Sequence, residues 1–340
     1  MKLPNLNKIM ERFQSTEKKE SNPSVFWSIV RKEFTDYLTS WRIIILLLII
    51  VLTCVGSLYT VIVTIKEALD ATEQAKEIAK DSHLFLKLFT SSDGSLPPFI
   101  TFVTFLGPLL GIALGFDAIN SERNKGTLTR LMAQPIPRDY VINAKFVAAL
   151  LINVVLFFSL GFLVMAFGIL LLGLPITFEE FIRIICFLSL CIVYIAFWLN
   201  LGILFSVRFK QAATSALAGI AVWIFFSIFY NMIIDFISKS YLEAVTSAEE
   251  MVNRQGVLLN LMRLSPNYLF SESTTTLLSP EIRSLGPLTM EQTVGALAGP
   301  LPLGQSILLI WPQLTGMIAA TLICFAISYI LFMRQEIRTN

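Results

Sequence analysis

Six long apolar runs constrain the fold of this chain more than any other feature of its sequence. Crossing the hydrocarbon core of a bilayer takes about 20 helical residues, and every run reaches that length. In lipid only helices and closed barrels satisfy their own backbone hydrogen bonds, and runs of this length indicate helices. The expected spans are residues 43–65, 97–119, 146–173, 181–206, 212–235 and 306–333. The sequence therefore predicts an all-α polytopic membrane protein.

The composition argues against several classes of function. Only 15% of the residues are charged, whereas about 25% is typical of soluble domains. A net charge of +2 gives no surface for nucleic acid. His83 stands alone and is a poor metal ligand, so no metal site is expected. No disulfide framework is expected either, because all four cysteines lie within apolar runs; they are Cys54, Cys186, Cys191 and Cys324.

Lysine and arginine in the connecting loops favour one orientation in the membrane. Seventeen of them lie on the side that holds both chain ends and loop 117–145. Five lie on the other side when the long loop 236–305 is left out of the count. Basic residues stay on the cytoplasmic side, and loops longer than about 60 residues carry little weight in this count. We therefore expect a plasma-membrane protein with both termini in the cytoplasm. Its outer loops, 64–96 and 236–305, are expected to be helical.

The segment before the first span is expected to form an amphipathic connecting helix over residues 24–42, behind a polar cytoplasmic tail at 1–23. Apolar side chains recur at helical spacing on one face, with charged side chains on the other. Trp41 suits the headgroup layer of a membrane. The helix is interpreted as an anchor that sets the tilt of the first span, or additionally as a contact for a cytoplasmic partner. The charged candidates for that contact are Arg31, Lys32 and Glu33.

The loop 117–145 is polar although the runs on both sides of it are apolar. Residues 121–126 predict a charged turn, in which Gly126 takes a positive φ. Thr127 is suited to cap a short helix over residues 128–134. The loop is therefore expected to work in water against a partner.

Two prolines limit this short helix. Pro135 and Pro137 end it, because proline cannot continue the hydrogen-bond ladder of a helix. Arg138 and Asp139 then start the helix that feeds the third span, with the carboxylate near its positive end. We expect a rigid lever that transmits a push, with a small apolar face made of Leu128, Leu131 and Met132.

This loop resembles the coupling loop in the permease subunits of type-2 ATP-binding-cassette exporters. The pattern is a Glu-Arg pair, Gly-Thr-Leu, a leucine, a proline, an arginine, and a lysine that enters the next span. Segments 30–42 and 264–280 are similar to the subgroup that includes the nitrous-oxide reductase maturation permease. The matching loop positions are Glu122, Arg123, Gly126, Thr127, Leu128, Leu131, Pro135, Arg138 and Lys145.

The resemblance implies a six-span permease domain over residues 43–340 whose coupling helix docks on an ATPase. Two separate ATPase subunits would bind ATP and Mg²⁺, since this chain has no phosphate-binding G-x-x-x-x-G-K-[ST] motif. A second permease, identical or related, would complete the route. No catalytic residues and no cofactor are expected on this chain. A non-transporting scaffold or signalling subunit, or a membrane enzyme, remains the alternative.

Two sets of residues inside the spans have alternative interpretations. Glycines four residues apart on the second span indicate close helix packing, either within the chain or against a second permease; they are Gly107, Gly111 and Gly115. The resemblance also implies that the second and fifth spans line the substrate route, where aromatic side chains suit an amphipathic or hydrophobic substrate. The candidates for that route are Phe102, Phe105, Phe225, Phe229 and Asn231.

Overall fold

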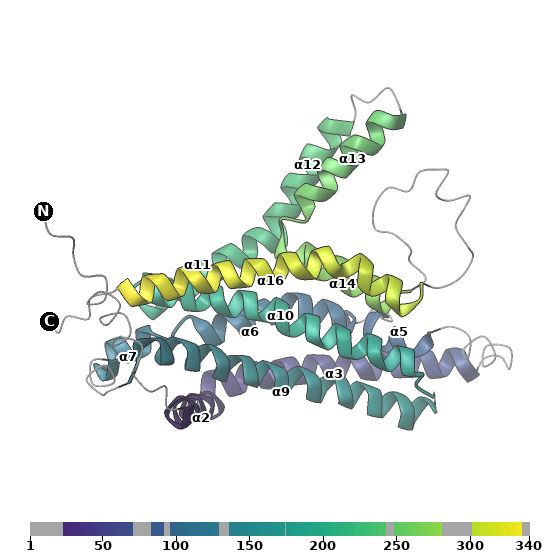
Figure 1. Cartoon of the computed structure of the whole chain (residues 1–340). Helices are drawn as coiled ribbons and strands as arrows, with labels where there is room; N and C mark the ends of the chain where they lie inside the picture. Colours follow the sequence, from purple (N-terminus) through teal and green to yellow (C-terminus); the bar gives the residue numbers. More distant parts are fainter. Residues whose placement is uncertain are drawn as a thin grey trace, which may run out of the picture.

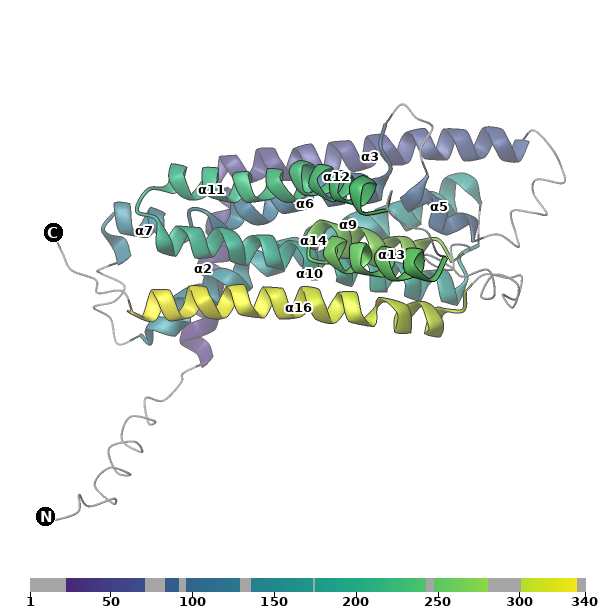
Figure 2. The same cartoon turned by 90° about the horizontal axis from the view of Figure 1, so that it is seen from above.

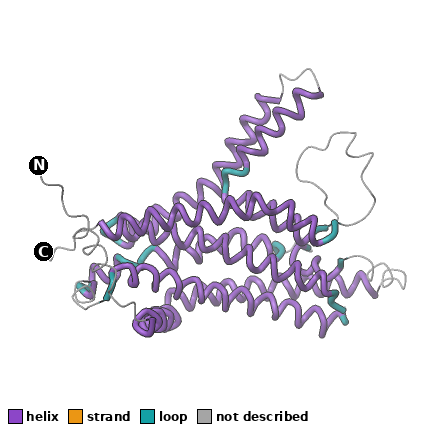
Figure 3. The backbone as a smooth tube through the Cα atoms, in the orientation of Figure 1, coloured by secondary structure: helices purple, strands orange, loops and turns teal. Residues whose placement is uncertain are grey.

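The computed structural model consists of helices joined by loops, with no strand in the parts of the chain that it describes (Figure 3). Six helical segments in these parts are long and apolar enough to cross a membrane. The predicted all-α, multi-pass architecture is therefore confirmed. The described residues are 23–70, 83–91, 96–128, 136–173, 175–242, 248–280 and 301–334.

The membrane-length helices lie side by side and form an elongated bundle (Figures 1 and 2). Helix α10 is its centre, because it packs against α6, α9, α11, α14 and α16 and has the largest buried share of the six segments. The bounds are α3 Trp41–Asp70, α6 Phe99–Gly115, α9 Arg138–Leu172, α10 Phe178–Arg208, α11 Ala212–Ile224 and α16 Leu303–Arg334.

Glycine allows α6 and α10 to approach closely within one chain. A Cβ atom on Gly115 would lie 2.5 Å from the carbonyl oxygen of Leu199, and one on Gly111 would lie 2.8 Å from that of Ile195. Real Cβ atoms do not reach such distances, so larger residues would push the helices apart. These two glycines face α10, and Gly107, which has more room, faces the Ile195 side chain.

Helix α2 (Pro23–Thr39) lies across one end of the bundle and packs on α9 and α3 (Figure 1). The chain breaks its helix at Ser40, and α3 begins at Trp41. The expected connecting helix over 24–42 is therefore shorter, and Trp41 belongs to the first span. Its side chain is 73% exposed, as expected for a residue in contact with the headgroup layer.

The fifth membrane-length segment contains a π-helix, η1 (Phe225–Phe229), between α11 and α12 (Tyr230–Leu242). π-helical turns bend the helix that contains them. Helix α12 leaves the bundle together with α13 (Ala248–Met262) as an antiparallel pair (Figure 1). The span expected over 212–235 is thus bent, and it continues as a helix to Leu242.

Two short helices close the end of the bundle opposite α2: α5 (Leu84–Thr90) and α14 (Pro266–Leu278). Arg183 of α10 is fully buried there. Its guanidinium donates to the carbonyl oxygen of Leu277 at 3.0 Å and to the hydroxyl of Ser306 at 3.1 Å, and pairs with Glu179 at 2.8 Å. Arg183 therefore joins α10, α14 and α16.

Candidate functional site

Three segments far apart in sequence meet at the end of the bundle that carries α2. They are α2 itself, the short helix α7 (Asn120–Asn124) and the first turns of α9. Val30 of α2 packs on Ala144 and Ala148 of α9, where small side chains permit close approach. The rings of Phe26 and Tyr140 meet edge to face at 5.4 Å. These contacts fix the connecting helix against the start of the third span.

A buried lysine connects all three segments. The Nζ atom of Lys145 on α9 lies 2.7 Å from Oε2 of Glu33 on α2 and 2.9 Å from Oε1 of Glu122 on α7. Lys32 pairs with the other oxygen of Glu33 at 2.9 Å. The side chains of Lys145, Glu33 and Glu122 are 6%, 8% and 12% exposed. We name these three residues the charge bridge.

The charge bridge also lowers the pKa of the Glu33 carboxyl group. Burial alone raises the pKa of the Glu33 carboxyl group, but the adjacent Lys145 ammonium, assisted by Lys32, outweighs it and holds that pKa below its ordinary value. Oε2 of Glu122 is buried without a hydrogen-bond partner among the described residues. Removing Lys145 would therefore leave two carboxylates close together in a site of low polarity, which is costly.

Beside the charge bridge, a cleft of about 630 Å³ lies between α2, the start of α3, the loop after α6 and α9. Arg42 pairs with Asp117 across it at 2.9 Å and lies over the ring of Phe116 at 5.7 Å. The hydroxyl of Tyr37 donates to the carbonyl oxygen of Leu114 at 3.0 Å. These contacts hold α2 and the start of α3 to the end of α6.

Asn120 links α7 to the turn between α10 and α11. The hydroxyl of Ser206 accepts from the backbone N–H groups of Ile119 and Asn120 at 2.9 and 3.1 Å. In the amide orientation that satisfies both of its polar atoms, Asn120 donates to the carbonyl oxygen of Phe209 and accepts from the hydroxyl of Ser215, both at 2.8 Å. The short helix is thus held to two spans besides α9.

The polar loop differs from its prediction in two respects. Asn120–Asn124 is helical where residues 121–126 were expected to be a charged turn. Gly126 does have a positive φ, 68°, and Thr127 donates to the carbonyl oxygen of Glu122 at 3.2 Å, at the end of α7. Leu128 is only 3% exposed and packs in the core of its own chain. Leu128 was expected to form part of an exposed docking face, and its burial rules this out.

The other predicted coupling residues differ in their exposure. The exposed surface at this end contains Arg31, Lys32 and Arg138, together with the tip around Lys125 and Gly126. Glu33 was assigned to the charged, partner-facing side of its helix, and the structure corrects this, because its carboxylate points into the charge bridge. Arg123 is half-buried in α7. Leu131, Met132 and Pro135 lie outside the described residues.

The predicted substrate-route residues lie on α6 and around η1. Phe105 packs edge to face on Trp223 of α11 at 4.8 Å. Phe105, Phe225 and Phe229 are 49%, 41% and 53% exposed, and Phe102 is half-buried. Asn231 is exposed and donates to the carbonyl oxygen of Ser227 at 3.4 Å. The structure thus places α6 beside α11 and leaves these aromatic rings without full cover.

Sequence reasoning missed Glu33 as a partner of Lys145, and it missed Asn120, Ser206 and Ser215. One signal for Glu33 was available, because Val30 and Tyr37 flank it at helical spacing and so place it on the apolar face. Among the described residues no group of three His, Cys, Asp or Glu could hold a metal ion.

The fold and this site define a multi-pass helical membrane protein with a polar, ion-paired joint at one end of its bundle. The comparison with protein families agrees: the chain belongs to the ABC-2 family of transporter proteins, whose family model matches residues 27–337.

Two relatives have the same name, "Probable ABC transporter permease protein NosY". The protein of Stutzerimonas stutzeri is 28% identical over 151 residues, which is 43% of this chain and 53% of the relative. The protein of Pseudomonas aeruginosa is 26% identical over 212 residues, which is 61% of this chain and 69% of the relative. The match thus spans about half of the first relative and about two thirds of the second.

Proposed function

We propose that this chain is the permease subunit of an ABC exporter and moves an amphipathic or hydrophobic substrate out of the cell. Membership of the ABC-2 family and the name of the two relatives support the permease role. Two separate ATPase subunits bind ATP and Mg²⁺ and drive the cycle. A second permease subunit, identical or related, completes the membrane route.

The charge bridge is the observation that carries this proposal. Nucleotide-driven movement of an ATPase would reach the permease through the loop that contains α7. Because Lys145 pairs with both Glu122 on α7 and Glu33 on α2, a displacement of the loop pulls on α9 and the connecting helix together. Buried ion pairs have a defined geometry, so this joint passes on movement that a solvated loop would absorb.

Orientation follows from the distribution of basic residues. Both termini, α2 and α7 lie on the cytoplasmic side, and α5, α13 and α14 lie toward the outer side of the plasma membrane. The excess of lysine and arginine on the side of α7 supports this arrangement. It also places the charge bridge where a cytoplasmic ATPase can reach it.

The nature of the substrate is inferred from the exposed rings of Phe105, Phe225 and Phe229. Aromatic surface favours apolar or amphipathic molecules. A charged substrate would lose its hydration here without gaining a counter-ion, because the surrounding parts of α6 and α11 carry no charged residue.

A reconstituted complex tests the proposed function. The chain and the ATPase subunit that co-purifies with it are placed in vesicles, and the ATP-dependent movement of a fluorescent short-chain phospholipid is followed. The triple variant Glu33→Gln, Glu122→Gln and Lys145→Met removes the charges but keeps the size of the site. We expect it to assemble and to lose most ATP-driven movement, while Lys66→Met, on the exposed far part of α3, behaves as the wild type.

Two results would contradict the proposal. Full transport by the triple variant would show that the charge bridge does not couple the subunits. Absence of transport and of any ATPase response in the wild type, with a range of hydrophobic candidates, would favour a scaffold.

A further inference from the structure

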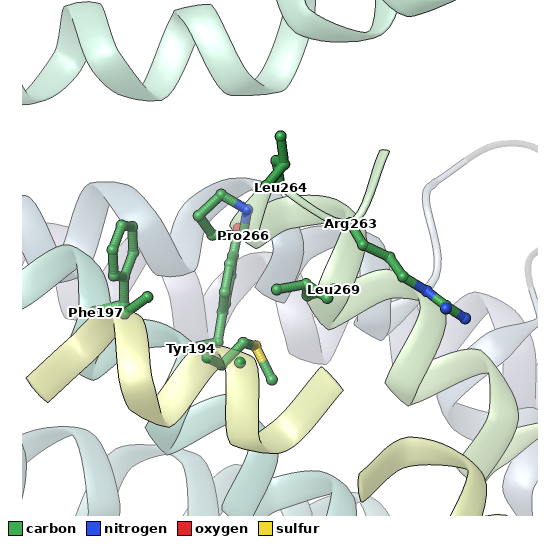
Figure 4. A pocket seen from close by; sticks show the side chains of 9 residues that line it. Tyr194, Phe197, Arg263, Leu264, Pro266 and Leu269 are labelled. Carbon is green, nitrogen blue, oxygen red and sulfur yellow. The ribbon is translucent and has the colours of Figure 1, made fainter. Parts of the chain in front are cut away.

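A second cavity, of about 260 Å³, lies between α10, α14 and α16, away from the charge bridge (Figure 4). Tyr194 and Arg263 are its only polar lining residues among those the structure describes. The rest of the lining is apolar, with Phe197, Leu269 and Met317 as its largest members. Neither the transport route proposed above nor the coupling site uses this cavity.

The two polar lining residues direct their polar groups elsewhere. The hydroxyl of Tyr194 lies 2.9 Å from the carbonyl oxygen of Thr104 and 2.8 Å from Oδ1 of Asn267. Arg263 lines the cavity with its stem, and its guanidinium points away from the centre (Figure 4), where it pairs with Glu272 at 2.6 Å. The interior thus offers water little to bind. Apolar cavities of about 150 Å³ stay dry and accept hydrocarbon molecules instead.

The surroundings of the cavity identify the available occupant. Its rim includes Gly316, which is exposed, and Leu264, which is 68% exposed; Ile318, two residues after Gly316 on α16, is 39% exposed. Because α16 is one of the membrane-length helices, the medium against this rim is lipid hydrocarbon. An empty apolar cavity forfeits packing contacts on all its walls, and a hydrocarbon chain restores them.

One charged donor at the rim remains available. Nε and Nη2 of Arg263 bind Glu272 at 3.0 and 2.6 Å. Nη1 has no partner within the described part of the chain. An amphiphile that leaves the cavity along the stem of Arg263 brings its headgroup to this nitrogen, and phosphate is the group that arginine binds well.

We propose that this cavity binds one acyl chain of a membrane glycerophospholipid, whose phosphate lies at the guanidinium of Arg263. The bound acyl chain fills the space between α14 and α16 and holds α14 against the bundle. The cavity is thus a lipid site on the permease surface, and none of its lining residues is among those proposed for the substrate route.

Photolabelling of the full chain in nanodiscs tests this proposal. The probe is a phosphatidylcholine with a diazirine in the middle of one acyl chain, and labelled peptides are located by mass spectrometry. Gly316 lines the cavity, so Gly316→Leu is designed to fill it; a Cβ atom there lies 3.7 Å from Leu269, an ordinary contact. Gly304→Leu is the matched control on the same helix, where nothing lies within 4 Å.

In the wild type we expect labels on the peptides that line the cavity, within 194–197, 264–269 and 316–320. Labelling there should fall about tenfold in Gly316→Leu, since hydrophobic pockets discriminate by that factor or more against a few extra carbon atoms. Gly304→Leu should label as the wild type does. If Gly316→Leu does not assemble, Ala320→Leu serves the same comparison.

Two outcomes would overturn the proposal. One is equal labelling of the cavity peptides in the wild type and in the filled variant. The other is an unlabelled cavity in the wild type while lipid-facing peptides of α3 are labelled. The second outcome would mean that protein, from this chain or from a second copy, occupies the cavity.

Discussion

The ammonium nitrogen of Lys145 lies 2.7 Å from Oε2 of Glu33, a residue 112 positions earlier in the chain. Both side chains are more than nine-tenths buried. This pair attaches the connecting helix to the helix that leaves the polar loop, and Glu122 attaches the loop itself to the same lysine. Three segments that would otherwise move separately are thus held at one atom.

Removal of Glu33 should destabilise the protein more than removal of its neighbour Asp36. Glu33→Ala leaves Lys145 buried with one partner, and breaking a buried pair costs about 3 kcal/mol. Asp36 pairs with Lys32 on the exposed side of α2, where a pair is worth less than about 1 kcal/mol. Thermal unfolding of both variants in detergent measures the difference. Equal melting temperatures would contradict the structural role of the charge bridge.

The folded protein should become less stable in acid, because Glu33 becomes protonated there. The folded-state pKa of its carboxyl group lies below the ordinary value of 4.5, so its contribution is complete above that pH. The contribution is lost as the pH falls through the lower folded-state pKa, because protonation breaks the pair with Lys145. The melting temperature of the wild type should drop below that pH, and Glu33→Gln should show a smaller drop. Parallel curves for the two proteins would exclude Glu33 as a source of the effect.

Close packing of α6 on α10 should not tolerate a methyl group at Gly115. A Cβ atom there would lie 2.5 Å from the backbone oxygen of Leu199, and backbone cannot move aside cheaply. We expect Gly115→Ala to cost about 2 kcal/mol or more, and Gly304→Ala, in open space, to cost almost nothing. Folded yield and melting temperature provide the comparison. A stable Gly115→Ala would indicate that the two helices are farther apart than the structure shows.

Arg183 should be needed for the helices opposite α2. Arg183→Leu leaves the carbonyl oxygen of Leu277 and the hydroxyl of Ser306 without this donor, at a cost of about 3 kcal/mol. Arg254, which is partly exposed and pairs with Glu250 on the same helix, is the control. Limited proteolysis of α14 reports the loss directly. If the Arg183→Leu and Arg254→Leu variants resist proteolysis of α14 equally, Arg183 does not hold α14 to the bundle.

Hydrophobicity alone predicted the six spans, because a backbone in lipid has no alternative to helix at that length. The bend at Phe225–Phe229 was not predictable in this way, since all five residues suit an α-helix in lipid. In the structure a tertiary contact meets this turn: Asn267 donates to the hydroxyl of Ser227 at 2.8 Å.

The candidate site was predicted only in part. Lys145 enters an apolar run and therefore requires a partner, but sequence does not say which carboxylate supplies it. Glu33 was placed with the charged residues Arg31 and Lys32, although its helical neighbours Val30 and Tyr37 are on the packed face. Leu128 was expected to meet a partner protein because it is apolar, and it packs within its own chain for the same reason.

Site-specific photocrosslinking tests the central claim, that the loop around α7 docks on an ATPase subunit. A benzophenone amino acid replaces Lys125 at the exposed tip of the loop. In a separate control variant it replaces Met251 on α13, which is proposed to lie on the outer side of the membrane. We expect position 125 to capture the ATPase subunit in cells, with a yield that changes when ATP is trapped by vanadate, and position 251 to capture none. Failure of position 125 to capture the ATPase, or equal capture at both positions, would contradict the account.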